Sequence, residues 1–110
     1  VAKFESSALL GRGGLGTINV KSAGNSNTDT NGNALDASRF TVTVAAIGNN
    51  DTGNAASYSS YGAHILVSAP AGSVTTDRTG AAGYNGLPGQ EDYTNGFGGT
   101  SAAGTPQAAA

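Results

Sequence analysis

The fold is indicated most clearly by residues Phe40–Ile47, whose sequence is FTVTVAAI. β-Branched residues dominate its first half, and the run from Val42 onward is nearly continuous in apolar character. Such a run is typical of a strand that is covered on both faces, as in a parallel sheet. We therefore expect a buried parallel strand here.

The neighbouring sequence supplies the other elements of an open α/β pattern. Downstream, residues Ile65–Ala69 (ILVSA) form a second apolar run of the same kind, which Pro70 ends. Upstream, residues Leu15–Ala23 (LGTINVKSA) are rich in β-forming residues and predict another strand. Residues Val1–Leu10 carry apolar side chains close to a 3.6-residue period, which predicts a short helix ended by Gly11.

Polar and glycine-rich stretches connect these elements. Residues 24–38 contain almost no apolar side chain and predict a long loop, a feature that in compact domains tends to be functional or mobile. Residues 72–95 form a second turn-rich region. From Ser101 onward Ala dominates, and Ala favours the helix more than any other residue. The order helix, strand, loop, strand, strand, loop, helix predicts an α/β fold without internal repeats.

Composition excludes several classes of function. The net charge is −2, and five scattered basic residues do not form the clustered Lys and Arg of a nucleic-acid-binding surface. No apolar run approaches the roughly 20 residues of a membrane span. Because the chain has no Cys, it offers neither a disulfide, a zinc-thiolate site nor a thiol nucleophile. The 110 residues begin without Met and stop in a predicted helix, so we expect a piece of a longer protein.

Three motifs follow one another along the chain. The first is Gly11–Ile18 (GRGGLGTI), followed shortly by Ser22–Asn25 (SAGN). The second joins Tyr58–Gly62 (YSSYG) to Val67–Pro70 (VSAP), and the third is Gly98–Pro106 (GGTSAAGTP). In this order they resemble the C-terminal portion of the catalytic domain of a subtilisin-like serine protease (subtilase) of the kexin and furin branch. The resemblance covers nearly the whole chain.

The resemblance implies that residues 1–110 form part of a three-layer α/β fold with a mainly parallel sheet and flanking helices. It also implies a secreted or extracellular serine endopeptidase, with Ser101 as nucleophile and Asn25 in the oxyanion hole. The partners that the resemblance implies are a polypeptide substrate and the upstream part of the catalytic domain. The implied substrate-binding residues are Ser22, Ala23, Gly24 and Thr100.

The residue types suit this chemistry. Glycines before Ser101 allow close backbone approach, and a Ser that opens a helix has its hydroxyl near the positive end of the helix dipole. Asn25 follows a predicted strand, and ligands of open α/β sheets gather at the carboxyl ends of strands. Taken alone, Gly-Thr-Ser also fits a helix N-cap, and Asn25 also fits a turn. Only the joint occurrence of the motifs favours the catalytic interpretation.

The general base and the carboxylate of a catalytic triad are not expected in this sequence. His64 is the only His, and it follows Asn25, whereas the resemblance implies a catalytic His before it. We therefore expect a structural role for His64 and expect the catalytic Asp and His upstream of Val1. The isolated chain should be inactive and poorly stable. All five Asp residues lie in turn-like surroundings: Asp29, Asp36, Asp51, Asp77 and Asp92.

Calcium is a possible structural ligand, since the resembled family commonly binds it. The candidate metal ligands are Asp29, Asn31 and Asp36, which together with Asn33 place oxygen atoms along one loop. A solvated, turn-rich loop explains the same residues.

Two departures from the family pattern leave an alternative open. The spacing from Ser101 to Pro106 is one residue longer than in the family, and Ser60 stands where furin relatives carry an acidic residue. A preference for basic substrates is therefore not expected to carry over. The alternative function is a truncated or degenerate non-catalytic subtilase module with a binding or structural role. A cell-surface adhesion domain would explain the composition but not the order of the motifs.

Overall fold

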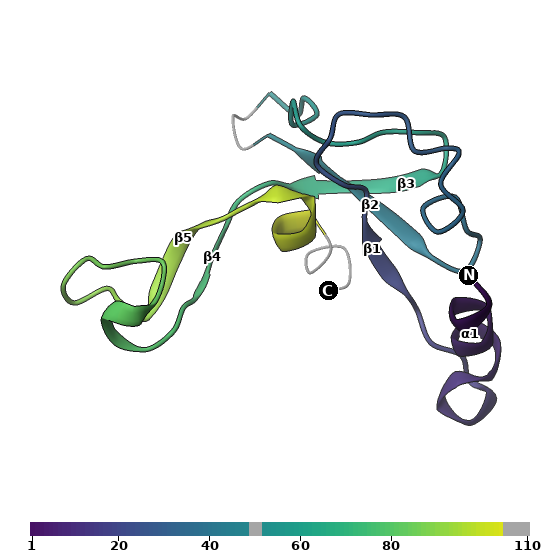
Figure 1. Cartoon of the computed structure of the whole chain (residues 1–110), viewed down its shortest axis with the longest axis horizontal. Helices are drawn as coiled ribbons and strands as arrows, with labels where there is room; N and C mark the ends of the chain where they lie inside the picture. Colours follow the sequence, from purple (N-terminus) through teal and green to yellow (C-terminus); the bar gives the residue numbers. More distant parts are fainter. Residues whose placement is uncertain (49–51, 105–110) are drawn as a thin grey trace.

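The computed structural model describes residues 1–48 and 52–104, and its elements are arranged around a small sheet (Figure 1). The strands are β1 (Val20–Ser22), β2 (Val42–Ile47), β3 (Ile65–Pro70), β4 (Ser73–Thr76) and β5 (Tyr93–Phe97). The helical elements are α1 (Ala2–Gly14), the short turn η1 (Gly80–Ala82) and a single wide turn, η2 (Thr100–Gly104). Among the residues so described, no helix has the length and apolar character needed to cross a membrane.

Strand β2 is the middle strand of a three-stranded parallel sheet. The strand order is β1-β2-β3, with Lys21 opposite Thr43 on one side and Ala45 opposite Ser68 on the other. The side chain of Val44 is fully buried, as expected for a strand with neighbours on both edges and cover on both faces. The prediction of an α/β fold built on a parallel sheet is confirmed.

The core of the sheet consists almost entirely of small side chains. Its buried apolar residues in the described part of the chain are Ala23, Val44, Ala45, Ala46, Ala56, Ala69, Ala71 and Ala102. The partly buried Tyr58 packs against three of these residues, Ala46, Ala56 and Ala71. Small residues let the strands and the turn η2 approach closely, and η2 contacts β1, β2 and β3. The consequence is a closely packed but thin core, because little apolar area is buried per residue.

Helix α1 has its regular part where the sequence predicts it. Its backbone leaves helical geometry at Gly11 (φ −59°, ψ 155°), and Arg12 and Gly13 have positive φ. No residue of α1 is buried. The helix is connected to the sheet mainly through Asn19, whose Nδ2 donates to the carbonyl oxygens of Phe4 (3.3 Å) and Phe40 (3.1 Å).

The expected strand at residues 15–23 is wrong in its first half. Only Val20–Ser22 pair with β2. The preceding backbone is bonded to α1 instead, with the Gly16 N–H donating to the Gly11 carbonyl (2.9 Å) and the Thr17 N–H to the Ser7 carbonyl (3.1 Å). Ile18, which gave this stretch its β character, is 83% exposed.

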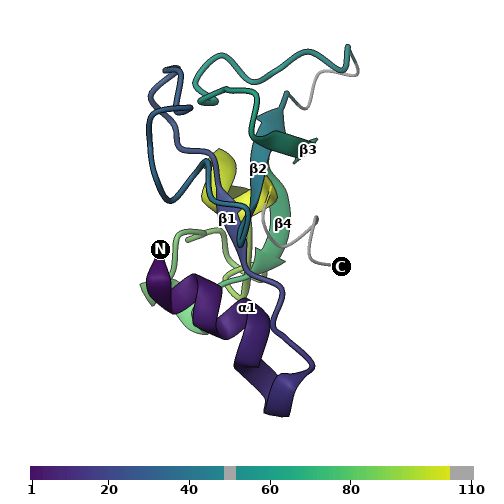
Figure 2. The same ribbon diagram turned by 90° about the vertical axis from the view of Figure 1, so that its right-hand side faces the viewer.

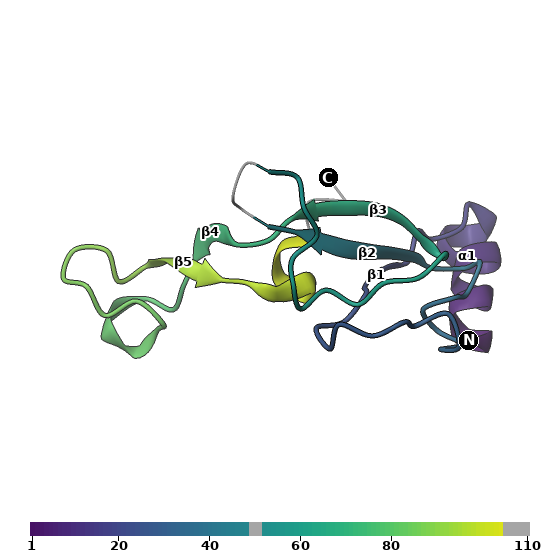
Figure 3. The same ribbon diagram turned by 90° about the horizontal axis from the view of Figure 1, so that it is seen from above.

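The turn-rich region 72–95 contains an antiparallel hairpin that the sequence does not predict. Strands β4 and β5 pair with Thr75 opposite Thr94, and the hairpin extends away from the sheet (Figures 1 and 3). Helix α1 lies at the opposite end of the molecule in both views. Strand β5 runs almost directly into η2, so the hairpin is continuous with the segment that carries Ser101.

Strand β3 is far more exposed than its apolar sequence predicts. Leu66 is 79% and Val67 39% exposed, and the expectation that both faces of this strand are covered is wrong for the chain as described. The reason is missing cover, because among the described elements β3 contacts mainly η2 and β2, its one neighbour in the sheet. Figure 2 shows α1 beneath β1, far from β3. Asp51, Pro106 and the predicted helix beyond Gly104 lie outside the described residues.

Candidate functional site

The contact between Thr100 and Asn25 brings together two motifs that are 75 residues apart in sequence. Thr100 is fully buried, and both its N–H (3.0 Å) and its hydroxyl (2.8 Å) donate to Asn25 Oδ1. The Thr100 hydroxyl also accepts from the Gly24 N–H at 3.2 Å. A backbone N–H can only donate, so the oxygen end of the Asn25 amide must face Thr100. The Nδ2 end is therefore the donor that Asn25 can offer to a ligand.

Gly99 lies against that donor end of Asn25. Its φ is +81°, and a Cβ added to it would lie 3.0 Å from Asn25 Nδ2. A side chain here would both strain the backbone and press on the amide. The doubled Gly before Thr100 therefore has a specific role at its second position, which is to leave room for Asn25.

The hydroxyl of Ser101 lies at the same place. Its Oγ is 3.1 Å from Ser22 Oγ, at the end of β1, and the residue is exposed. Ser101 is the second residue of η2, directly after the buried Thr100. The structure thus brings the predicted nucleophile and the predicted oxyanion donor to one edge of the sheet, the carboxyl end of β1.

The segment Ser22–Asn25 is held from two directions. The Ala23 N–H donates to the Val44 carbonyl (2.9 Å) on β2, and Ala23 is buried. The Gly24 carbonyl accepts from the Ser60 N–H (2.9 Å), and Gly24 has φ +99°. A Cβ on Gly24 would lie 3.4 Å from Ser60 Oγ. All four predicted substrate-binding residues therefore lie in or beside this fixed segment.

Ser59 and Ser60 support the site, a role that the sequence analysis missed. Both are buried, and Ser59 Oγ accepts from the Ala46 N–H at 3.1 Å. The Ser60 N–H holds the Gly24 carbonyl. The signal in the sequence is the motif Tyr58–Gly62 itself, because two adjacent Ser residues shortly before a strand offer hydroxyl and backbone groups to their neighbours.

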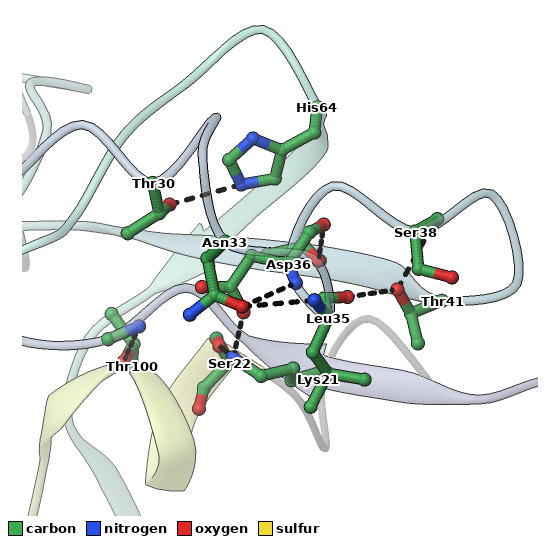
Figure 4. A network of polar contacts seen from close by, with 12 residues as sticks. Lys21, Ser22, Thr30, Asn33, Leu35, Asp36, Ser38, Thr41, His64 and Thr100 are labelled. Carbon is green, nitrogen blue, oxygen red and sulfur yellow. Dashed lines mark hydrogen bonds and ion pairs between the residues drawn. The ribbon is translucent and has the colours of Figure 1, made fainter. Parts of the chain in front are cut away.

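The hydrogen bonds of His64 go to the loop 24–38. Its Nε2 lies 3.2 Å from Thr30 Oγ1 (Figure 4), and its Nδ1 lies 3.2 Å from Asn31 Oδ1. These contacts join the loop to the start of β3. They agree with a structural role for His64, which stays a prediction.

Each of the candidate calcium ligands has a side-chain oxygen in contact with another group of the protein. Asp29 Oδ1 accepts the Asn31 N–H (2.8 Å), and Asn31 Oδ1 accepts the Ala63 N–H (2.8 Å). Asp36 is 3% exposed and forms an ion pair with Lys21. Within residues 1–48 and 52–104, no group of three or more His, Asp or Glu is arranged to hold a metal ion.

Asp77 has a shifted pKa, and it lies in the hairpin rather than at Ser101. The N–H of Asn85 (2.9 Å) lowers the pKa of Asp77, and the N–H groups of Arg78 (2.8 Å) and Tyr84 act in the same direction. These bonds favour the ionised carboxylate. Asp77 therefore organises the far turn of the hairpin rather than the Ser101 site.

The chain is similar to known peptidases over most of its length. Residues 3–110 match the model of the subtilase family of peptidases. The chain is 36% identical over 107 aligned residues to a calcium-dependent protease of Trichormus variabilis, and 35% identical over 107 to one of a Nostoc species. Each alignment covers 84% of this chain but 16% of the relative, so the chain spans about a sixth of the length of these proteins. Because the family model covers almost every residue, the chain belongs to the subtilase family.

Proposed function

We propose that this chain supplies the nucleophile and the oxyanion hole of a serine endopeptidase. The observation that carries the proposal is the orientation of the Asn25 amide, whose oxygen is held by Thr100 next to Ser101. Ser101 Oγ attacks the carbonyl carbon of a peptide bond. The C–N bond then breaks, the amine leaves with the proton that the general base took from Ser101, and the acyl group stays on Ser101 as an ester. Asn25 Nδ2 and the Ser101 N–H donate to the developing oxyanion. Water then releases the acyl group.

The general base that takes the Ser101 proton belongs, in this proposal, to an upstream part of the same catalytic domain. A triad needs a His hydrogen-bonded to the nucleophile and a carboxylate that orients it. His64 makes its hydrogen bonds with the loop 24–38. Residues 1–110 are accordingly proposed as the C-terminal portion of the domain, in the kexin and furin branch, and the protein as secreted. The gene sequence upstream of Val1 tests this, since it must encode an Asp and a His motif in frame.

Ser60, which is hydrogen-bonded to Gly24, is relevant to substrate preference. Ser60, which holds the Gly24 carbonyl, is buried and uncharged where furin relatives carry an acid. An uncharged group offers no partner for a cationic substrate side chain. We therefore propose that the enzyme does not require basic residues in its substrates. Structural calcium, which the names of both relatives suggest, is proposed for sites outside the loop 24–38.

The test is steady-state hydrolysis of a chromogenic peptide by the full-length protein. Ser101→Ala should abolish turnover. Asn25→Ala should lower kcat by about 100- to 1,000-fold with little change in KM, which is the magnitude measured for loss of an oxyanion-hole Asn in a subtilisin. Asn95→Ala is the matched control, since Asn95 is exposed on β5. Undiminished hydrolysis by Ser101→Ala would contradict the proposal and favour the non-catalytic alternative.

A further inference from the structure

Lys21 and Asp36 form an ion pair next to Ser22, the residue whose hydroxyl contacts Ser101 Oγ. The Asp36 side chain is 3% exposed and that of Lys21 28%. Among the described residues, the Lys21 ammonium is the partner of the buried Asp36 Oδ1, which accepts no other hydrogen bond. A buried carboxylate without a counter-charge is strongly unfavourable, so the burial of Asp36 depends on Lys21.

The same ammonium makes a second bond, to the strand that leads into the site. Lys21 Nζ donates to the carbonyl oxygen of Ser22 at 2.8 Å. On the other side, the Asp36 carbonyl accepts from the hydroxyl of the fully buried Thr43 at 2.8 Å. Lys21 and Thr43 are opposite one another in the β1–β2 register. Through these contacts Asp36, near the end of the loop 24–38, is bonded to Lys21 on β1 and to Thr43 on β2. Figure 4 shows Lys21, Ser22 and Asp36 in one network.

Ser22 connects the Lys21–Asp36 ion pair to the nucleophile Ser101. Its carbonyl is fixed by Lys21, while its hydroxyl lies 3.1 Å from Ser101 Oγ. Three residues further along the same segment is Asn25, whose amide is held by Thr100. A shift of β1 at Ser22 would thus move the oxyanion donor and the nucleophile relative to each other.

The loop does not fit a calcium ion in this arrangement. Calcium takes six to eight oxygen ligands, whereas no three acidic or His side chains of the described residues are grouped to hold a metal ion, and Asp29 Oδ1 and Asn31 Oδ1 each accept an N–H. Asp36, the buried carboxylate among the candidates, is neutralised by Lys21. A divalent ion beside Asp36 would meet the positive charge of that ammonium at short range.

We propose that the Lys21 ammonium is the internal cation of the loop 24–38 and acts as a positioning residue for Ser101 and Asn25. It fixes the Asp36 carboxylate and the Ser22 carbonyl together, without calcium in this loop. The inference deepens the proposed function and rests on it.

The experiment uses the full-length protein with Lys21→Ala, Asp36→Asn and the double variant, and Lys3→Ala as the matched control, because Lys3 is exposed on α1. Lys21→Ala and Asp36→Asn should each lower kcat by about 100-fold with KM nearly unchanged, since small displacements of reacting groups have effects of this size. Propylammonium should restore activity to Lys21→Ala severalfold. Tetramethylammonium, a cation without N–H donors, should not, and neither amine should act on the double variant.

The calcium concentration for half-maximal activity should be the same in the wild type and in Asp36→Asn. A raised calcium requirement in Asp36→Asn would overturn the inference, because it would make Asp36 a calcium ligand. A kcat of Lys21→Ala equal to that of Lys3→Ala, or equal rescue by both amines, would overturn it as well.

Failure of the proposed function gives a different result. If the wild type shows no hydrolysis that depends on Ser101, the endopeptidase proposal fails. The contribution of the ion pair to stability is then measured as the midpoint of thermal unfolding. Propylammonium should raise the midpoint of Lys21→Ala but not that of the double variant, and the absence of this difference would contradict the role of Lys21 as internal cation.

Discussion

The orientation of the Asn25 side-chain amide follows from one hydrogen bond, which the Thr100 N–H donates. The Thr100 N–H, 3.0 Å from Asn25 Oδ1, cannot accept a hydrogen bond, so the amide is fixed with its nitrogen toward the Gly99 side. The sequence predicted Asn25, Thr100 and Ser101 as site residues, because their motifs occur in a recognisable order. It could not predict the orientation, since the contact depends on how two segments 75 residues apart meet.

Gly99→Ala should impair catalysis more than Gly89→Ala, although both substitutions strain the backbone equally. Gly99 and Gly89 both have φ +81°, where Ala is strained by roughly 1–2 kcal/mol. A Cβ at Gly99 would lie 3.0 Å from Asn25 Nδ2, whereas one at Gly89 meets nothing within 4 Å. Gly99→Ala should therefore lower kcat by about tenfold or more through displacement of Asn25, and Gly89→Ala should leave it nearly unchanged. Equal kcat values for the two variants would show that Gly99 does not control the amide.

Strand β2 could be predicted from sequence, and β4 and β5 could not. Residues Val42–Ile47 carry a continuous apolar signal because the strand is covered on both faces. The hairpin strands (SVTT and YTNGF) are short and mostly exposed, and a long turn from Asp77 to Asp92 separates them. The usual sequence signal of a hairpin is a turn of two to five residues. Because the turn here is much longer, the sequence does not indicate that the two strands pair.

The far turn of the hairpin should loosen in acid. The N–H of Asn85, with those of Arg78 and Tyr84, lowers the pKa of Asp77 below its ordinary value of 3.8. The folded turn therefore binds the proton more weakly than the unfolded one. Its stabilisation is fully present above pH 3.8 and is lost as the pH falls through the lowered pKa.

Amide hydrogen exchange at Tyr84 and Asn85 measures this effect. Protection relative to the intrinsic exchange rate should fall below pH 3.8 in the wild type. In Asp77→Asn, which has no proton to gain, protection should be lower throughout and independent of pH over the same range. Protection in the wild type that does not change with pH would show that the Asp77 carboxylate does not hold the turn.

The described chain is more open than a self-sufficient domain of its length. Its radius of gyration is 16.1 Å, whereas a compact chain of 110 residues has about 13 Å. Its accessible surface is 6859 Å², against about 5,500 Å² for a folded monomer of this mass. The large exposed apolar side chains include Leu15, Ile18, Leu66 and Val74. Sequence alone predicted a parallel sheet but not which of its faces lacks cover, because cover depends on residues far away in the chain.

The isolated chain should consequently behave differently from the full-length protein. It should bind an apolar dye such as anilinonaphthalene sulfonate strongly, because Leu66 and its neighbours on β3 are exposed. The full-length protein should bind little. Leu66→Ser should reduce dye binding by the isolated chain, while Ser38→Ala, a control substitution on the loop 24–38, should not. Weak dye binding by the isolated chain would indicate that these side chains are covered within it.

Ser101 as the nucleophile, with Asn25 beside it, is the centre of the proposed chemistry. The decisive measurement is labelling of the full-length protein with a fluorophosphonate, followed by mass spectrometry of the labelled peptide. We predict a single modified residue, Ser101, with a labelling rate that falls by about 100-fold or more in Asn25→Ala because the phosphonyl oxygen loses its donor. Modification of a different residue, or labelling of Ser101 at the same rate in Asn25→Ala, would contradict this chemistry.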